Sequence, residues 1–500
     1  MQARHIYRFC LLALIVLYIA VRIWRLNDSC LWFDEIFSVH AAEHSWLGLF
    51  SFAAADLIHP PLFYILLKTW ILLGGESLLW LRLLPAFISF VAVIPFLLLC
   101  REFLPRRSAT LFAFLLFAVD GSLIKYSQEV RMYSLLMCLG LFSIWLLCRW
   151  RYEGKGIILL TIVNTLLVYT HYAGWLIIGS EFLVVLFFQR ELLKRFCCIA
   201  GIAVAVFVPW LIAVWRASVR GDLAENIGWI ERPGPASLLQ FLLNLFEPFY
   251  SQPSSIGAVS IYQVTIPILL IVLVSVTAFL SQSPANEPDR SRRAWLLFAI
   301  APTVLLFVTS LILPYSVWGT RHLVFVFPLI FILIASVISG VYSDWLRIGS
   351  ITLISLFVCY AFVLQIQRPV EPQIWCAWEQ LAQRIEEDSE PKKLYVFEDL
   401  NAYHFWFATR NRNDLKIIKV NGVADMIEDK AYFLPRGFDG VQPISSYEIS
   451  GDHFWIAFRD MKWDERHPPI NVLIERGYKI GQPEIVDADG LKAFLVKIDK

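Results

Sequence analysis

Apolar segments of membrane-spanning length restrict the possible folds of this chain more than any other feature of its sequence. A helix needs about 20 apolar residues to cross the hydrocarbon core of a bilayer. Eleven segments of about that size centre near residues 16, 92, 115, 141, 165, 181, 206, 270, 303, 331 and 356. Only 17% of the residues are charged, against about 25% in an ordinary soluble domain. The sequence therefore predicts an α-helical polytopic membrane protein.

The loops between these segments carry their basic residues in a one-sided pattern. These residues are Arg101, Arg106, Arg107, Arg149, Arg151, Lys155, Arg190, Lys194, Arg195, Arg290, Arg292, Arg293 and Arg347. The positive-inside rule places them in the cytoplasm together with the N-terminus. The first apolar segment lacks a small-residue cleavage site and is expected to remain as a helix. The expected topology leaves the C-terminus outside.

The segment from 60 to 73 is apolar as well, but a crossing there would invert every later basic loop. It is about 14 residues long and opens with two prolines, which suit the first turn of a helix. We therefore expect an amphipathic helix that lies in the membrane interface.

Three regions are expected on the outer side: residues 26–81, about 217–260, and the tail after about 367. The tail alternates strand-like runs with helix-like stretches, which predicts a small α/β domain with a mostly parallel sheet. The runs are 393–397, 415–420, 453–458 and 492–497, and the helical stretches are 375–387 and 468–476. The expected domains are a transmembrane module over residues 1–366, which includes the first outer loop, and an extracytoplasmic α/β domain over 367–500.

Charge and cysteine usage exclude some classes of function. The net charge is +1 and the basic residues form no block, so nucleic acid is not an expected partner. Most of the nine cysteines lie inside apolar segments, and none has metal-like C-x-x-C spacing. Cys30 and Cys376 both fall in expected outer regions. One possible pair does not indicate a fold built on several disulfides. The sequence leaves open whether Cys30 and Cys376 are bonded.

Two adjacent carboxylates, Asp34 and Glu35, follow the first apolar segment. A carboxylate at the bilayer centre costs roughly 2.5–3.5 kcal/mol, so such a pair usually faces a water-filled cavity. One interpretation is structural, as a helix cap or a salt bridge to Arg22 or Arg25. The other is a general base for a sugar or lipid hydroxyl, which contributes roughly 10²–10⁴-fold to a rate.

Further polar residues lie at the expected outer ends of other apolar segments. Gln128 and Arg131 have the spacing of one helix face, and Lys125 and Glu129 have that of an ion pair. Alone, His59 is better explained as an interfacial anchor and His171 as a core histidine, whereas Arg131 and Arg321 are consistent with interfacial anchors or with phosphate ligands. All candidates are expected on one side of the membrane, whereas independent anchors would be distributed over both faces. We therefore predict that they share a site. The other candidates are His59, Tyr133, His171, Tyr172, Arg321 and His322.

Together these residues resemble the membrane glycosyltransferases of the GT-C superfamily, and within it the broad glycosyltransferase-39/PMT-2 group. That group includes protein O-mannosyltransferases and the aminoarabinose transferase that modifies lipid A. The matching motifs are Trp32-x-Asp34-Glu35, His59-Pro-Pro-Leu-Phe-Tyr64, Leu81-Arg-Leu-Leu-Pro85, Tyr126-Ser-Gln-Glu-x-Arg-Met-Tyr133, Thr170-His-Tyr172 and Arg321-His-Leu.

The resemblance implies a GT-C fold and an inverting transfer of sugar from a polyprenyl-phosphate donor. The implied acceptor is a lipid, polysaccharide or protein at the outer face of the plasma (inner) membrane. Asp34 and Glu35 match the catalytic acids, and Arg131 and Arg321 match phosphate-side positions. Many relatives have Asp where this chain has Tyr133, so no second acid is expected there. No cofactor is expected, and a divalent metal stays open.

The resemblance also implies donor or substrate contacts for the remaining candidates. His59 stands where many relatives have a basic residue before two prolines. The other residues for which the resemblance implies donor or substrate contacts are Gln128, Glu129, Tyr133, His171, Tyr172 and His322.

The main rival is a transporter or flippase of lipid-linked sugars. Transporters place charged residues near the membrane midplane on broken helices, often within internal repeats. Here the apolar segments are nearly free of charge and the polar groups gather on one side, which favours the transferase. An O-antigen-ligase-like enzyme that moves whole glycans is a second rival, which the sequence does not separate.

Overall fold

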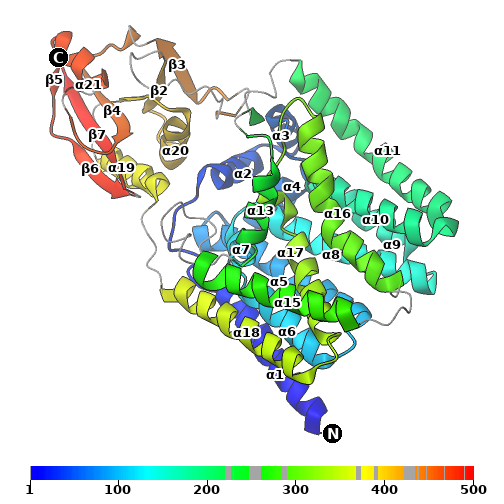
Figure 1. Ribbon diagram of the computed structural model, residues 1–500. Coiled ribbons are helices and arrows are strands. Elements are labelled where there is room, and N and C mark those ends of the chain that lie inside the picture. The colour runs from blue at the N-terminus through cyan, green and yellow to red at the C-terminus, as the bar shows by residue number, and fades with distance from the viewer. Residues whose placement is uncertain are drawn as a thin grey trace. The chain divides into compact units, whose positions relative to one another are not determined.

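The computed structural model describes residues 2–219, 227–228, 230–246, 261–282, 290–367, 373–387, 392–421, 434–435, 438–445, 448–464, 466, 468–488 and 490–500 (Figure 1). Within them, seven helices are long and apolar enough to cross a membrane, and a bent pair makes an eighth. Shorter apolar helices cover the expected segments near 165, 181 and 331. Each of the eleven expected centres falls within a helix, which confirms a polytopic helical membrane protein.

The chain divides into two compact units. One comprises Met1–Leu26, His59–Trp215 and Ile230–Arg368, and we call it the helical unit. The other comprises Asn27–Ile58, Arg216–Trp229 and Pro369–Lys500, and we call it the mixed unit. The part of the first outer loop that carries Asp34 and Glu35 therefore groups with the tail.

The helical unit consists mainly of apolar helices. Its elements are α1 (Gln2–Ile23), α4 (Leu62–Gly74), α5 (Leu78–Phe103), α6 (Arg107–Val119), α7 (Gly121–Gln128), α8 (Tyr133–Glu153), α9 (Ile157–Thr170), α10 (Gly174–Phe188), α11 (Leu193–Ser218), α13 (Pro235–Asn244), α15 (Ile266–Gln282), α16 (Arg290–Ile312), α17 (Val326–Ser339) and α18 (Asp344–Gln367).

A break separates α6 from α7, which meet at 54° and form a broken span or a re-entrant loop. Such a break leaves backbone carbonyls without helical partners, which is costly away from water. Arg22 of α1, fully buried, donates to the carbonyl oxygens of Phe117 (3.1 Å) and Ala118 (2.9 Å). Its Nε donates to Ser89 Oγ at 3.1 Å. Arg22 thus supplies hydrogen bonds to carbonyl groups at the helix break, and all three of its guanidinium nitrogens donate inside the bundle.

The helix expected over residues 60–73 is present as α4. Its 13 residues give a length of roughly 20 Å, too short for the hydrocarbon core. Two tryptophans fasten it to α5: Trp70 Nε1 donates to the Trp80 carbonyl (2.7 Å), and Trp80 Nε1 donates to the Trp70 carbonyl (2.8 Å). The two rings stack with centroids 4.3 Å apart.

The mixed unit contains a seven-stranded sheet with the order β3-β2-β1-β4-β7-β5, in which β6 also pairs with β7. The pairings among β3, β2, β1 and β4 are parallel, whereas β7 is antiparallel to each of its three partners. Its elements are α2 (Phe33–Glu43), α3 (Trp46–Asp56), α19 (Ile374–Glu387), β1 (Lys393–Val396), α20 (Asp399–Thr409), β2 (Lys416–Asn421), β3 (Val441–Ser445), β4 (His453–Asp460), α21 (Pro468–Glu475), β5 (Lys479–Ile480), β6 (Glu484–Ala488) and β7 (Leu491–Asp499).

The expectation of a mostly parallel sheet is therefore wrong for its second half. The four predicted strands and both predicted helices are present, but β3, β5, β6 and α20 were not predicted. Gly490, with φ of 76°, lies in the tight connection between β6 and β7. A positive φ favours glycine and a hairpin turn, so the chain returns antiparallel instead of crossing over through a helix.

Candidate functional site

In the helical unit, three histidines and an arginine from four separate segments lie close together. Nη2 of Arg131 donates to Nε2 of His59 at 3.2 Å. The ring of His171 has its centroid 5.5 Å from that of His59 and 5.0 Å from that of His322. Arg131 is buried, with 2% of its surface exposed. We call His59, Arg131, His171 and His322 the histidine–arginine cluster.

Each member of the cluster lies at a helix end or in a connection. His59 precedes the two prolines before α4, and Arg131 lies between α7 and α8. His171 caps the C-terminus of α9 in an extended conformation, and His322 lies in the short 3₁₀ helix Thr320–Leu323 ahead of α17. Backbone N–H and C=O groups at helix ends lack partners within the helix, so they can form hydrogen bonds that orient these side chains.

The backbone fixes which nitrogen of His171 carries the proton. The N–H of Ala173 donates to Nδ1 of His171 at 2.9 Å, so the neutral ring bears its hydrogen on Nε2. That Nε2 is buried and has no hydrogen-bond partner among the described residues. Burial and the neighbouring charges of His322, His59, Arg131 and Arg321 hold the pKa of His171 well below its ordinary value. The cluster therefore contains a buried, neutral N–H donor.

His322 has the opposite arrangement. Its Nδ1 lies 3.0 Å from the carbonyl oxygen of Val317, which can only accept, so Nε2 is left as an acceptor. Burial, and then the charge of Arg321, lower the pKa of His322 to about 3. A Cβ on Gly319 would come within 3.2 Å of this ring, so glycine leaves the space that the imidazole occupies.

The structure uses other predicted residues differently. The α7 helix ends at Gln128, so Gln128 and Arg131 do not share a helix face, and that expectation is wrong. The Gln128 amide instead donates to carbonyls at the end of α1, the nearest that of Trp24 at 2.7 Å. Lys125 and Glu129 form the expected ion pair at 3.5 Å.

Two tyrosines and one arginine are the remaining predicted site residues of the helical unit. The ring of Tyr133 lies 6.3 Å from that of His171, so it borders the cluster. Tyr172 accepts a hydrogen bond from Trp210 Nε1 of α11 at 3.2 Å. Arg321, partly buried, lies near enough to influence the pKa of His171 and His322. In the described part of the chain, no group of three or more His, Cys, Asp or Glu side chains is arranged to hold a metal ion.

Sequence reasoning missed the groups that set the two tautomers. The Ala173 amide, the Val317 carbonyl and the space at Gly319 carry no side-chain signal. Only the glycine beside the Arg321-His322 motif could have suggested a close approach.

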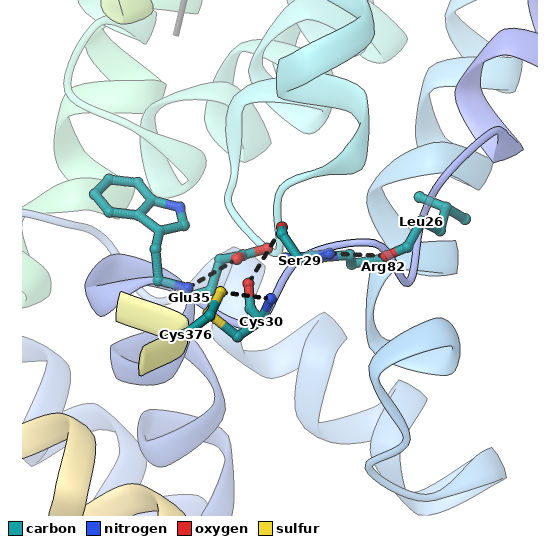
Figure 2. Close-up of a disulfide and its surroundings, with 7 residues drawn as sticks. Leu26, Ser29, Cys30, Glu35, Arg82 and Cys376 are labelled. Atoms are coloured by element: carbon teal, nitrogen blue, oxygen red, sulfur yellow. Dashed lines mark hydrogen bonds between the residues drawn. A yellow bond between two sulfur atoms is a disulfide. The ribbon is translucent and has the colours of Figure 1, made fainter. Parts of the chain in front are cut away.

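The acidic pair belongs to the mixed unit and begins α2. Both side chains lie in its first turn, where the helix dipole favours negative charge. Glu35 is buried, with 1% of its surface exposed, and its Oε2 accepts from the backbone N–H of Trp32 at 3.1 Å (Figure 2). Asp34 is only partly buried. Glu35 therefore caps the helix, and Asp34 is the more accessible of the two carboxylates.

Two buried histidines of the mixed unit predict a pH-dependent stability. Burial lowers the pKa of His40 and of His404 to about 3 each. Because the folded pKa lies below the unfolded one, this stability is complete above about pH 6.5 and is lost as the pH falls toward 3. We expect a loss of ~2 kcal/mol per histidine at about pH 5. Thermal unfolding of the full chain at several pH values measures it.

The control for this prediction is the exposed His453, which pairs with Asp499. We expect His404→Gln to flatten the pH dependence of unfolding, and His453→Gln to flatten it less. An equal slope in wild type and His404→Gln would contradict the assignment.

Comparisons with solved structures identify the class of this fold. No family model matches the sequence, and no curated protein matches it. The structure is similar to that of ArnT from Cupriavidus metallidurans bound to undecaprenyl phosphate, with a TM-score of 0.61 at 12% identity over 97% of each chain. The apo state of the same ArnT gives 0.60, over 99% of this chain and 98% of that one. The chain has the GT-C fold.

A second GT-C structure agrees with this assignment. The oligosaccharyltransferase of Archaeoglobus fulgidus, in complex with zinc and sulfate, matches with a TM-score of 0.51 at 12% identity. That match covers 82% of this chain and 62% of the other. The GT-C fold predicted from the motifs is thus confirmed, and the ArnT match extends it across nearly the whole chain.

Proposed function

We propose that this protein is a membrane glycosyltransferase that moves a sugar from a polyprenyl-phosphate donor to an acceptor hydroxyl, with inversion. The observation that carries the proposal is the buried Nε2–H of His171 beside Arg131, a pair of donors suited to a phosphate. The likeness to an ArnT structure that holds undecaprenyl phosphate supports a lipid-linked donor.

The histidine–arginine cluster is assigned to the donor's phosphate. Arg131 offers a planar fork of N–H groups, Arg321 adds a second cation, and His171 adds a neutral donor. When the bond between the anomeric carbon and the phosphate oxygen breaks, its electron pair passes to that oxygen. Donors fixed in advance stabilise this growing charge without reorganising. The bare Nε2 of His322 is suited to accept a hydrogen bond from a sugar hydroxyl.

The base step is assigned to Asp34. The acceptor oxygen forms the new bond to the anomeric carbon through an oxocarbenium-like transition state, and its proton goes to the carboxylate. A single displacement inverts the configuration. Glu35 is assigned to holding the first turn of α2 through its bond to the Trp32 amide.

The chemistry is assigned to the outer face of the plasma (inner) membrane. The basic loops favour a cytoplasmic N-terminus and an external first loop. A disulfide joins Cys30 of that loop to Cys376 of the tail (Figure 2), and such bonds persist in oxidising compartments. Loop and tail are therefore assigned to the same, external side.

The decisive experiment incubates the purified full chain, in lipid nanodiscs, with single-sugar polyprenyl-phosphate donors and follows the release of free polyprenyl phosphate. We expect release that depends on an added acceptor extract, and binding of undecaprenyl phosphate much tighter than that of the uncharged polyprenol. A transporter would release none, and a ligase would act only on donors that carry whole glycans. Either result would overturn the proposal.

A further inference from the structure

In the mixed unit, a covalent bond joins the acid-bearing loop to the C-terminal α/β domain. Cys30 and Cys376 form a disulfide although they are 346 residues apart in sequence (Figure 2). Cys30 stands four residues before Asp34, and Cys376 lies in the first turn of α19. The start of α2 can therefore move little relative to α19.

One tyrosine of the α/β domain contacts α2 near both of its ends. Tyr403 of α20 is fully buried. Its ring meets that of Phe33, the residue next to Asp34, edge-on at 5.3 Å. Its hydroxyl lies 2.8 Å from Nδ1 of His40, about two turns further along α2. A rigid side chain that touches both points fixes the direction of the helix axis.

Further contacts hold the C-terminal end of α2. Nε of Arg410 donates to Glu43 Oε1 at 3.0 Å. The His40 ring lies between aromatic side chains from both sequence regions, with centroids 4.6 Å from Phe52 and 4.4 Å from Trp406. Burial keeps the pKa of His40 low, so this ring packs as a neutral group.

We infer that the C-terminal α/β domain is a positioning element for the catalytic carboxylate, acting through Cys376 and Tyr403. The inference rests on the proposed function, since it gives Asp34 a task that needs accurate placement. A displacement of about 1 Å at a reacting group lowers a rate roughly 10²-fold. The tail therefore takes part in turnover without contacting the reacting atoms, and Cys30, Cys376 and Tyr403 are positioning residues.

The test compares Cys30→Ser, Cys376→Ser and the double variant with wild type in the full chain in nanodiscs. We expect turnover to fall about tenfold or more in each, and by the same factor in all three, because each lacks the same bond. The affinity for undecaprenyl phosphate should change less than about twofold, since the histidine–arginine cluster belongs to the helical unit. Cys359→Ser, which changes an exposed free cysteine of α18, is the matched control.

Hydrogen exchange supplies a readout that does not depend on activity. We expect amides of residues 33–43 to exchange faster in the double variant, with α17 unchanged. Tyr403→Phe keeps the ring and the disulfide but removes the hydroxyl at His40, so it tests the same idea without breaking the covalent bond. It should lower turnover with unchanged donor affinity.

The outcomes separate the two proposals. Unchanged turnover in the disulfide variants and Tyr403→Phe, or unchanged exchange over α2, would overturn the positioning role while leaving the transferase intact. Wild-type protein that releases no polyprenyl phosphate, but whose disulfide variants exchange faster over α2, would overturn the proposed function. In that case the domain would hold the loop without a catalytic purpose.

Discussion

Asp34→Asn is expected to lower sugar transfer roughly 10²–10⁴-fold, with little change in affinity for the donor. Asparagine keeps the shape of the side chain but cannot accept the acceptor's proton. Glu35→Gln is expected to lower transfer less, because the glutamine carbonyl can still accept from the Trp32 amide at the start of α2. Initial rates with a single-sugar polyprenyl-phosphate donor, together with donor titrations, separate the two variants.

This pair contains its own control, since two adjacent acids of one helical turn are changed in the same isosteric way. A larger loss in Glu35→Gln than in Asp34→Asn would exchange their roles. Full activity in both would remove the carboxylate base altogether. If an exogenous nucleophile such as azide restored the release of polyprenyl phosphate in Asp34→Asn, with the sugar leaving as the glycosyl azide, the base role would gain direct support.

Arg131→Met is expected to weaken undecaprenyl phosphate binding and to lower turnover roughly 10²–10³-fold, the usual loss for one fixed donor at a developing anion. Methionine fills much of the same volume without the charge or the N–H fork. The substitution also removes the hydrogen bond from Arg131 to Nε2 of His59. Arg131→Lys should recover only part of the binding, because a lysine is a point charge without bidentate geometry.

The matched control is Arg106→Met, which changes an exposed arginine of a basic loop ahead of α6. It is expected to leave donor binding and turnover near wild type. Titration with undecaprenyl phosphate and with the uncharged polyprenol measures the phosphate contribution to binding. Equal preference for the phosphate in wild type and Arg131→Met would remove Arg131 from the donor site.

Much of the helical unit could be predicted because its signal is local. A run of apolar residues such as α5 or α11 must be helical in a membrane whatever surrounds it, since its backbone has no other partners there. Predictions that depended on a continuing helix were weaker. The sequence predicted one helix that includes both Gln128 and Arg131, whereas α7 ends at Gln128 and the chain turns before α8.

Long-range pairings were harder to predict. The sheet turns antiparallel at β7, because a tight glycine connection and not a helix precedes that strand. The bond between Cys30 and Cys376 was left open by the sequence, since two cysteines 346 residues apart give no sign of their distance in space. Arg22, one proposed partner of the acidic pair, instead binds the carbonyls of the helix break.

The sequence by itself determined that this chain is a membrane protein of many helices. Hydropathy over about 20 residues is enough for that. Only the tertiary structure decided that Glu35 caps α2 while Asp34 stays more accessible. It also decided that Nε2 of His171 carries a hydrogen, whereas Nε2 of His322 is an acceptor. The reason is that a hydrogen-bonding role depends on which backbone groups lie within about 3 Å, and only the folded chain brings those groups together.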